Sequence, residues 1–88
     1  MSADEESLVQ RVREVVAKVL GVEPSAVVLG ARIDQVAQID SLSLAEIASA
    51  LDDAFAIRIP TAGMMEAQTV GDLAALVQGL VAARNGPA

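Results

Sequence analysis

The chain has 88 residues, a length that fits one small domain with a modest hydrophobic core. Apolar residues make up 53% of it but aromatic residues only 1%, so the core has to be built from aliphatic side chains. The net charge of −6 argues against nucleic acid and anionic membranes as partners and favours a basic protein surface. Histidine and cysteine are both absent, which removes the usual general base, the usual metal ligands and the thiol nucleophile. These exclusions favour a protein that acts through a partner over an enzyme, and they predict no metal site.

The same sequence gives an expectation about the compartment. It has no signal-like amino terminus and no apolar run near the roughly 18 residues that span a bilayer. Without cysteines there are no disulfides to form in an oxidising compartment. We therefore expect a cytoplasmic protein that does not insert into membranes.

The first helix is expected from about residue 2 to residue 20, because valines and a leucine recur there at helical intervals and Ser2 can cap it. Gly21 can end it, since glycine tolerates the left-handed conformation that follows many helices. A long connection follows, residues 21–39, without sustained periodicity. Its apolar side chains are expected to pack against the core: Val27, Val28, Leu29, Ile33 and Val36.

The second helix is expected over residues 40–55, and a short third helix over residues 61–67. The segment between them reads as an extended link, because Pro60 disfavours helical backbone at Ile59.

Thr69 and Asp72 have the spacing of a capping box and mark the start of the last helix. That helix ends near residue 85, with a flexible tail from about residue 84. The sequence thus predicts an all-α fold, a small bundle of three longer helices plus one short helix, with a long loop between the first two. It forms one domain over residues 1–88.

On a helical wheel the second helix has one apolar side and one exposed side. The apolar side holds Leu44, Ile47, Ala48, Leu51 and Phe55. The exposed side holds Leu42, Glu46, Ser49 and Asp53. Residues 40–72 carry six acids and one base, so the exposed leucine stands in the most acidic part of the chain. This side is either a docking surface for a basic partner, anchored by the leucine, or merely a solvated acidic face.

Ser41 stands at the amino end of the second helix, where backbone N–H groups and the helix dipole favour a negative group such as a phosphate ester. Asp40 and Ser43 can each cap this helix, so the Ser41 hydroxyl is not needed for that purpose. An acid followed by a serine at a helix start is nevertheless more often a cap than a modification site. The residues alone leave both interpretations open.

An ordered set of short motifs resembles the acyl carrier protein family along nearly the whole chain. The set comprises Leu20-Gly21-Val22, Asp40-Ser41-Leu42, Glu46-Ile47, Leu51-Asp52-Asp53-Ala54-Phe55, Ile57-Arg58-Ile59-Pro60 and Thr69-Val70-Gly71-Asp72. The resemblance implies that a transferase attaches 4′-phosphopantetheine from coenzyme A to Ser41, with Asp40 as the acid that precedes it. The thiol of this arm then holds an acyl group as a thioester, which gives a chain without cysteine a part in thioester chemistry.

The resemblance also implies partners and the surfaces they use. The partners are a phosphopantetheinyl transferase and acyl-transferring and condensing enzymes with basic docking patches, and the carrier itself is expected to be a monomer. The expected docking residues are Leu42, Glu46, Ser49, Asp53 and Met65. The acyl chain is expected to lie between the last three helices, beside Leu44, Ala48, Ile59, Met64 and Leu73. The two methionines fit an ordinary core equally well.

Departures from the family pattern bear on the pathway. Gln38 stands where the family usually has glycine, and Arg58 where an acid is more typical. They favour a discrete carrier in fatty-acid, polyketide or related specialised biosynthesis over the housekeeping carrier. Two alternatives stay open at this point: an aminoacyl or peptidyl carrier, which more often has paired glycines before the serine, and an unmodified helical adaptor. The adaptor would leave Asp40-Ser41-Leu42 unexplained.

Overall fold

The computed structural model describes residues 3–36 and 40–85, and its regular elements there are helices. The long helices are α1 (Ala3–Leu20), α3 (Ser41–Phe55) and α5 (Val70–Asn85), and the short one is α4 (Thr61–Glu66). This confirms the predicted all-α bundle of three longer helices and one short helix. The proposed cap at Ser2 and the residues after Asn85 lie outside the described part of the chain, as does Gln38.

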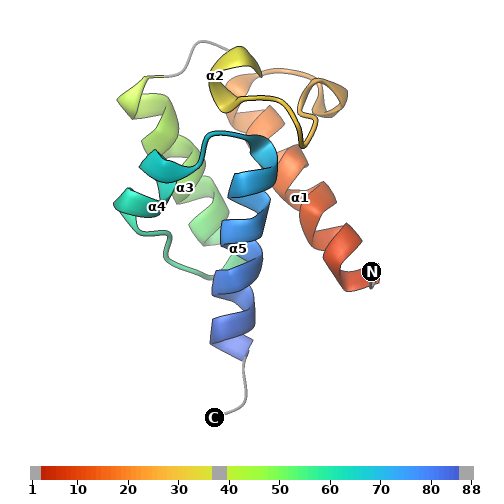
Figure 1. Ribbon diagram of the computed structural model, residues 1–88, viewed down its shortest axis with the longest axis vertical. Coiled ribbons are helices and arrows are strands. Elements are labelled where there is room, and N and C mark those ends of the chain that lie inside the picture. The colour runs from red at the N-terminus through yellow and green to blue at the C-terminus, as the bar shows by residue number, and fades with distance from the viewer. Residues whose placement is uncertain (1–2, 37–39, 86–88) are drawn as a thin grey trace.

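The long connection between α1 and α3 contains two single turns that the sequence pattern does not predict. They are the 3-10 turn η1 (Pro24–Ala26) and the one-turn helix α2 (Ile33–Val36). In Figure 1, α1 runs upward while α3 and α5 run downward, and α4 lies against the outer side of α3. Within residues 3–36 and 40–85, no helix combines the length and the apolar character needed to cross a bilayer.

The core lies where α1, α3 and α5 meet, and aliphatic side chains fill it. The buried residues are Val12, Val16, Ala17, Val27, Ile33, Ile47, Leu51, Ile59, Met64, Val70, Leu73, Ala74 and Val77. The apolar side predicted for the second helix is confirmed, because Ile47 and Leu51 are fully buried and Leu44, Ala48 and Phe55 pack against the core. Burying one such large aliphatic side chain stabilises the fold by about 1.5–3 kcal/mol, so the bundle needs no aromatic centre.

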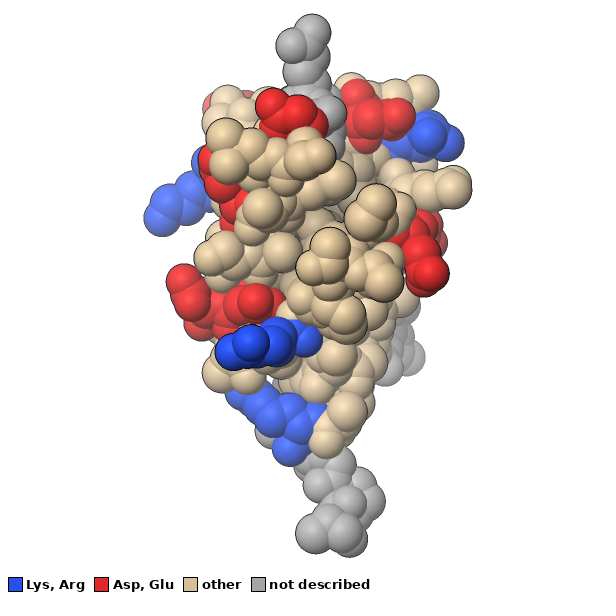
Figure 2. Space-filling model, turned by 90° about the vertical axis from the view of Figure 1, so that its left-hand side faces the viewer, with Lys and Arg blue, Asp and Glu red and all other residues tan. Residues whose placement is uncertain are grey.

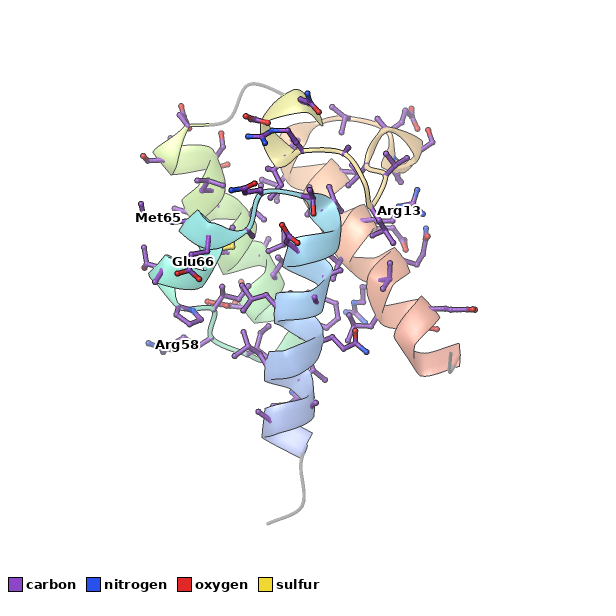
Figure 3. All side chains as sticks on the ribbon, in the orientation of Figure 1. Arg13, Arg58, Met65 and Glu66 are labelled. Atoms are coloured by element: carbon purple, nitrogen blue, oxygen red, sulfur yellow. The ribbon has the colours of Figure 1, made fainter. Side chains whose placement is uncertain are left out.

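Hydrogen bonds fasten the long connection to α1. Gly21 ends α1 with a φ of 69°, and the N–H of Val22 donates to Ala17 O at 3.0 Å. Arg13, labelled in Figure 3, then reaches across from α1. Its Nε donates to Val27 O at 2.6 Å and its Nη2 to Pro24 O at 3.2 Å. The connection is therefore held against α1 on one side.

The prediction that every apolar residue of the connection packs inward is wrong for two of them. Val27 and Ile33 are buried, but Val28 is 50% exposed and Leu29 is 43% exposed. The physical reason is a backbone contact: the N–H of Gly71 donates to Leu29 O at 2.8 Å. A Cβ at Gly71 would lie 3.1 Å from that same oxygen, so this glycine allows the two backbones to approach. Through this bond the backbone at Leu29 meets the start of α5. The side chain of Val36 lies outside what the structure describes.

Backbone hydrogen bonds also join the α2 region to the segment between α4 and α5. The N–H of Ile33 donates to Gln68 O, and the N–H of Val70 donates to Ala31 O, both at 3.0 Å. Arg32 and Thr69 form an isolated antiparallel bridge between these bonds. The upper end of the bundle in Figure 1 is thereby closed by a short pairing of two segments that are far apart in sequence.

The predicted capping box opens α5. The N–H of Asp72 donates to Thr69 Oγ1 at 3.0 Å, and Asp72 Oδ2 accepts the N–H groups of Gln68 and Thr69, both at 3.2 Å. These backbone donors, Gln68 first, hold the pKa of the Asp72 carboxyl below its usual value.

The carboxyl end of α3 is closed by its own backbone and by α5. Ala56 has a φ of 54° and a ψ of 49°, the left-handed conformation, and its N–H donates to Asp52 O. The N–H of Ile57 donates to the same oxygen at 3.1 Å. Arg84, near the end of α5, donates from Nη1 to Phe55 O at 2.9 Å. A cation near the negative end of a helix is also favoured by the helix dipole.

Candidate functional site

The site begins where α3 begins. Asp40 is the N-cap, and its Oδ1 accepts the N–H of Ser43 at 2.8 Å. This backbone N–H is the main reason that the pKa of the Asp40 carboxyl lies below its usual value. Ser41 follows as the first helical residue and is exposed. The cap is thus supplied by the acid, which leaves the serine hydroxyl available at a helix amino terminus that favours negative groups.

The exposed side of α3 has the composition that the helical wheel predicts. Glu46, Ser49 and Asp53 are exposed, and Leu42 is 67% exposed although it is a large apolar residue. Figure 2 views the molecule from the side on which α3 and α4 lie. Acidic side chains border a broad uncharged area there, and basic side chains lie at its upper right, on its left edge and at its lower end.

The link after α3 positions α4 beside it. Asp52 Oδ1 accepts the N–H of Ile59 at 2.8 Å, which fixes the extended link, and Ile59 itself is buried. Two consecutive methionines of α4 then point in opposite directions. Met64 is 3% exposed and belongs to the core, whereas Met65 is 74% exposed and, in Figure 3, points outward on the same short helix as Glu66.

A pocket of about 240 Å³ lies between α3 and α4, and we call it the serine pocket. Ser41 stands among its lining residues, together with Leu44, Ala48, Ile59, Met64 and Met65. Four of the five residues predicted for an acyl pocket are therefore brought together next to the serine. The fifth, Leu73, is fully buried in α5 and is not among the residues that line this pocket.

Sequence reasoning missed two lining residues, Ala45 and Thr61. Ala45 lies at the border between the two sides of α3, where a small side chain leaves room for the pocket. Thr61 follows Pro60 as the first residue of α4. Its place directly after this proline, at a helix start, is the sequence signal that could have indicated it as a lining residue.

Comparisons with known proteins agree with this geometry. Residues 10–77 match the family model described as phosphopantetheine attachment site. The meromycolate extension acyl carrier protein of Mycolicibacterium smegmatis is 35% identical over 80 residues, covering 91% of this chain and 81% of that protein. The acyl carrier protein of Rhodococcus erythropolis is 33% identical over 82 residues, covering 93% and 90%. The meromycolate extension acyl carrier protein of Mycolicibacterium aurum is 34% identical over 80 residues, covering 91% and 82%.

The residues of the site fit the group that this family model names, because an exposed serine at a helix start adjoins an apolar pocket. Members of the family work with a phosphopantetheinyl transferase and with biosynthetic enzymes. The chain belongs to the acyl carrier protein family: it is a carrier without an active site of its own, and its cofactor is 4′-phosphopantetheine.

Proposed function

We propose that Ser41 is the residue to which the 4′-phosphopantetheine arm is attached. One observation carries this proposal: Asp40 caps α3 through the N–H of Ser43, so Ser41 is exposed at the helix start without a capping task. Backbone N–H groups of the first turn and the helix dipole stabilise a phosphodiester at that position. Ser43, two residues further along the helix, is half-buried and less accessible.

The attachment step follows from the chemistry of the two groups. The Ser41 oxygen forms a bond to the phosphorus next to the pantetheine of coenzyme A, and the pyrophosphate P–O bond breaks. Adenosine bisphosphate leaves, and the hydroxyl proton goes to a base. When attached, the arm supplies a thiol that holds an acyl group as a thioester.

We propose that the exposed side of α3, together with Met65, is the surface on which partner enzymes dock. Leu42 is an exposed apolar side chain close to Ser41 in sequence, and Glu46, Ser49 and Asp53 follow it along the same side. Acids around an apolar anchor attract a basic surface over distance and then allow close contact. Delivery of the acyl group to enzymes with basic patches is the function that this surface supports.

The cargo we propose is an acyl chain, sheltered in the serine pocket during synthesis. The lining of this pocket is mostly apolar, and each methylene moved out of water into such a place contributes about 0.8 kcal/mol. Two relatives are named for meromycolate extension, which supports a role in chain extension within a specialised lipid pathway over aminoacyl transfer. The pocket also favours a carrier over an unmodified adaptor, because an adaptor has no use for it.

The attachment site is tested by intact-mass spectrometry after incubation with coenzyme A and a broad-specificity phosphopantetheinyl transferase. The wild-type chain is expected to gain one phosphopantetheinyl group, and Ser41→Ala none. Ser43→Ala is the matched control, because the Asp40 cap uses the backbone N–H of Ser43 and survives the change. It is expected to be modified fully. A mass gain in Ser41→Ala, with normal circular dichroism, would show that the arm is attached elsewhere.

A further inference from the structure

Arg58 stands in the extended link between α3 and α4, and hydrogen bonds fix the backbone of this link. The N–H of Ile57 donates to Asp52 O at 3.1 Å, and the N–H of Ile59 donates to Asp52 Oδ1 at 2.8 Å. Ile59 is buried and Ile57 packs against the core. Successive side chains of an extended segment point to opposite sides, so the residue between these two isoleucines points outward. Arg58 is exposed, as this alternation requires.

The fold makes no use of the Arg58 guanidinium. Each of the other arginines contacts a backbone oxygen, a carboxylate or an aromatic ring of this chain: Arg11, Arg13, Arg32 and Arg84. Within residues 3–36 and 40–85, the side chain of Arg58 forms no hydrogen bond, and the one salt bridge joins Arg32 and Asp34. The charge of Arg58 is therefore available to a partner without breaking a contact of the bundle.

Arg58 borders the proposed docking surface at the end away from Ser41. In Figure 3 it lies on the same outer side of the molecule as Met65 and Glu66, below both. Ser41 is the first residue of α3, and the link follows the last. The 15 residues of this helix, at about 1.5 Å each, put roughly 20 Å between its two ends. A partner that covers Met65 and extends along α3 therefore meets Arg58 at the rim of its contact.

The sign of the charge reverses along this surface. Glu46 and Asp53 are exposed on α3 and Glu66 is exposed on α4, whereas Arg58 adds a cation at the rim. A partner patch that is basic throughout is attracted by the acids but places a like charge opposite Arg58, which is unfavourable. A basic patch that ends in a carboxylate at this rim is complementary over its whole length. A repulsive element of this kind lowers the affinity for the wrong partner and so creates specificity.

Resting on the docking surface proposed above, we propose that Arg58 is a specificity-determining residue for partner enzymes. It selects enzymes whose basic docking patch ends in an acidic residue, roughly 20 Å from the place that receives the Ser41 end of α3. It disfavours enzymes whose patch is basic throughout. Because Arg58 lies at an exposed rim, its charge acts mainly on the rate of association.

The experiment measures kcat/KM for modification by a broad-specificity phosphopantetheinyl transferase with a basic docking patch, followed by intact-mass spectrometry. Because this enzyme represents the disfavoured class, Arg58→Glu is expected to raise kcat/KM by about two- to fivefold at low salt, and Arg58→Met by less. The gain should shrink as salt rises, since exposed charges are screened. Lys18→Glu, at an exposed base on α1, changes the net charge equally and is the matched control, with little gain expected.

A second arm of the experiment reverses the charge on the enzyme. A photo-crosslinking amino acid in place of Arg58 identifies the basic residue of the transferase that lies opposite, and that residue is replaced by glutamate. With this variant transferase the order should invert, so that the wild-type chain is modified faster than Arg58→Glu. The carrier variants should keep the wild-type melting temperature, because Arg58 is exposed and forms no hydrogen bond or salt bridge with the described residues.

The inference is overturned by equal kcat/KM for the wild type and Arg58→Glu at low salt, by an equal gain in Lys18→Glu, by the absence of a cross-link at position 58, or by an order that does not invert. Its failure can be told apart from that of the proposed function. If Leu42→Ala and Glu46→Lys slow modification while the Arg58 variants match the wild type, the docking surface stands and only this inference falls. If none of these variants differs, the docking surface falls as well.

Discussion

Ala56 has a backbone conformation that an L-amino acid rarely adopts, with a φ of 54°. This conformation ends α3, because the N–H groups of Ala56 and Ile57 both donate to Asp52 O. In this conformation a Cβ lies too close to the following carbonyl oxygen, at a cost of about 1–2 kcal/mol. Glycine removes that cost but adds freedom to the unfolded chain.

We therefore expect Ala56→Gly to raise the free energy of unfolding by about 0.5–1 kcal/mol. Urea unfolding followed by circular dichroism measures it, with Ala50→Gly in the middle of α3 as a control that should destabilise by about 0.5–1 kcal/mol. If both changes destabilised equally, the strain at Ala56 would not exist.

Replacing two leucines of α3 by alanine should change stability by very different amounts. Leu42 is 67% exposed, so Leu42→Ala should alter stability by no more than about 0.5 kcal/mol. Leu51 is fully buried, so Leu51→Ala should cost about 2–5 kcal/mol. If the exposed side is a docking surface, Leu42→Ala should nevertheless slow modification by the transferase. Steady-state transferase kinetics and melting curves on both variants test this, and unchanged kinetics would remove Leu42 from the docking surface.

At the scale of whole elements, two helix starts depend on ionised aspartates. Asp40 accepts the N–H of Ser43 at the start of α3, and Asp72 accepts those of Gln68 and Thr69 at the start of α5. Both carboxyls have a pKa lowered below the usual value of about 3.9. A lowered pKa means that the stabilisation is fully present above the unfolded value and is lost as the pH falls through the folded value.

We expect the melting temperature to fall as the pH is lowered from about 5 toward 2, in part through these two groups. Asp40→Asn and Asp72→Asn should each make that fall shallower, since a neutral amide cannot be protonated in this range. Asp53→Asn, at an exposed position on the helix surface, should leave the pH profile of the wild type nearly unchanged. Melting curves at each pH measure the effect, and identical profiles for all three variants would contradict it.

Sequence patterns predict those elements whose stability is local. The wheel of α3 gives the right sides because burial of Ile47 and Leu51 follows helical spacing, and Asp40 and Thr69 are recognisable as caps. The patterns fail where backbone meets backbone across the fold. Leu29 is exposed because its carbonyl bonds Gly71, and α2 is held by the bond between Ile33 and Gln68. No periodicity records such contacts.

The candidate site was predictable to a similar degree. Ser41, Leu44 and Met64 come together as expected, since they follow from two neighbouring helices. Leu73 is the exception: it is fully buried in α5 and does not line the pocket, and a helical wheel gives only the side of α5 on which it lies. A second pocket, lined by Arg32, Asp34 and Gln68 among others, is invisible in the sequence because it lies where two distant segments pair.

The whole molecule carries a net charge of −6, with its acids concentrated in residues 40–72. Glu46→Lys on α3 should therefore slow association with a basic transferase, and the difference should shrink as salt rises, because charges are screened over about 10 Å at 0.1 M. Glu14→Lys, at an exposed position on α1, changes the net charge equally and is the matched control. Initial rates at low and high salt measure both. Equal slowing in the two variants would mean that net charge acts and not the docking surface.

The hydrogen bonds at the two ends of α4 have a consequence for how cargo moves. Ile59, just before this helix, is bonded to Asp52, and Gln68, just after it, is bonded to Ile33 and Asp72. Outward movement of the whole helix would break these bonds, whereas the side chain of Met65, which is 74% exposed, can move while they stay intact. Rotamer changes of exposed side chains take picoseconds to nanoseconds, whereas displacement of a helix takes microseconds or longer. Handover to an enzyme would then be limited by the encounter between the two proteins and not by the opening of the carrier.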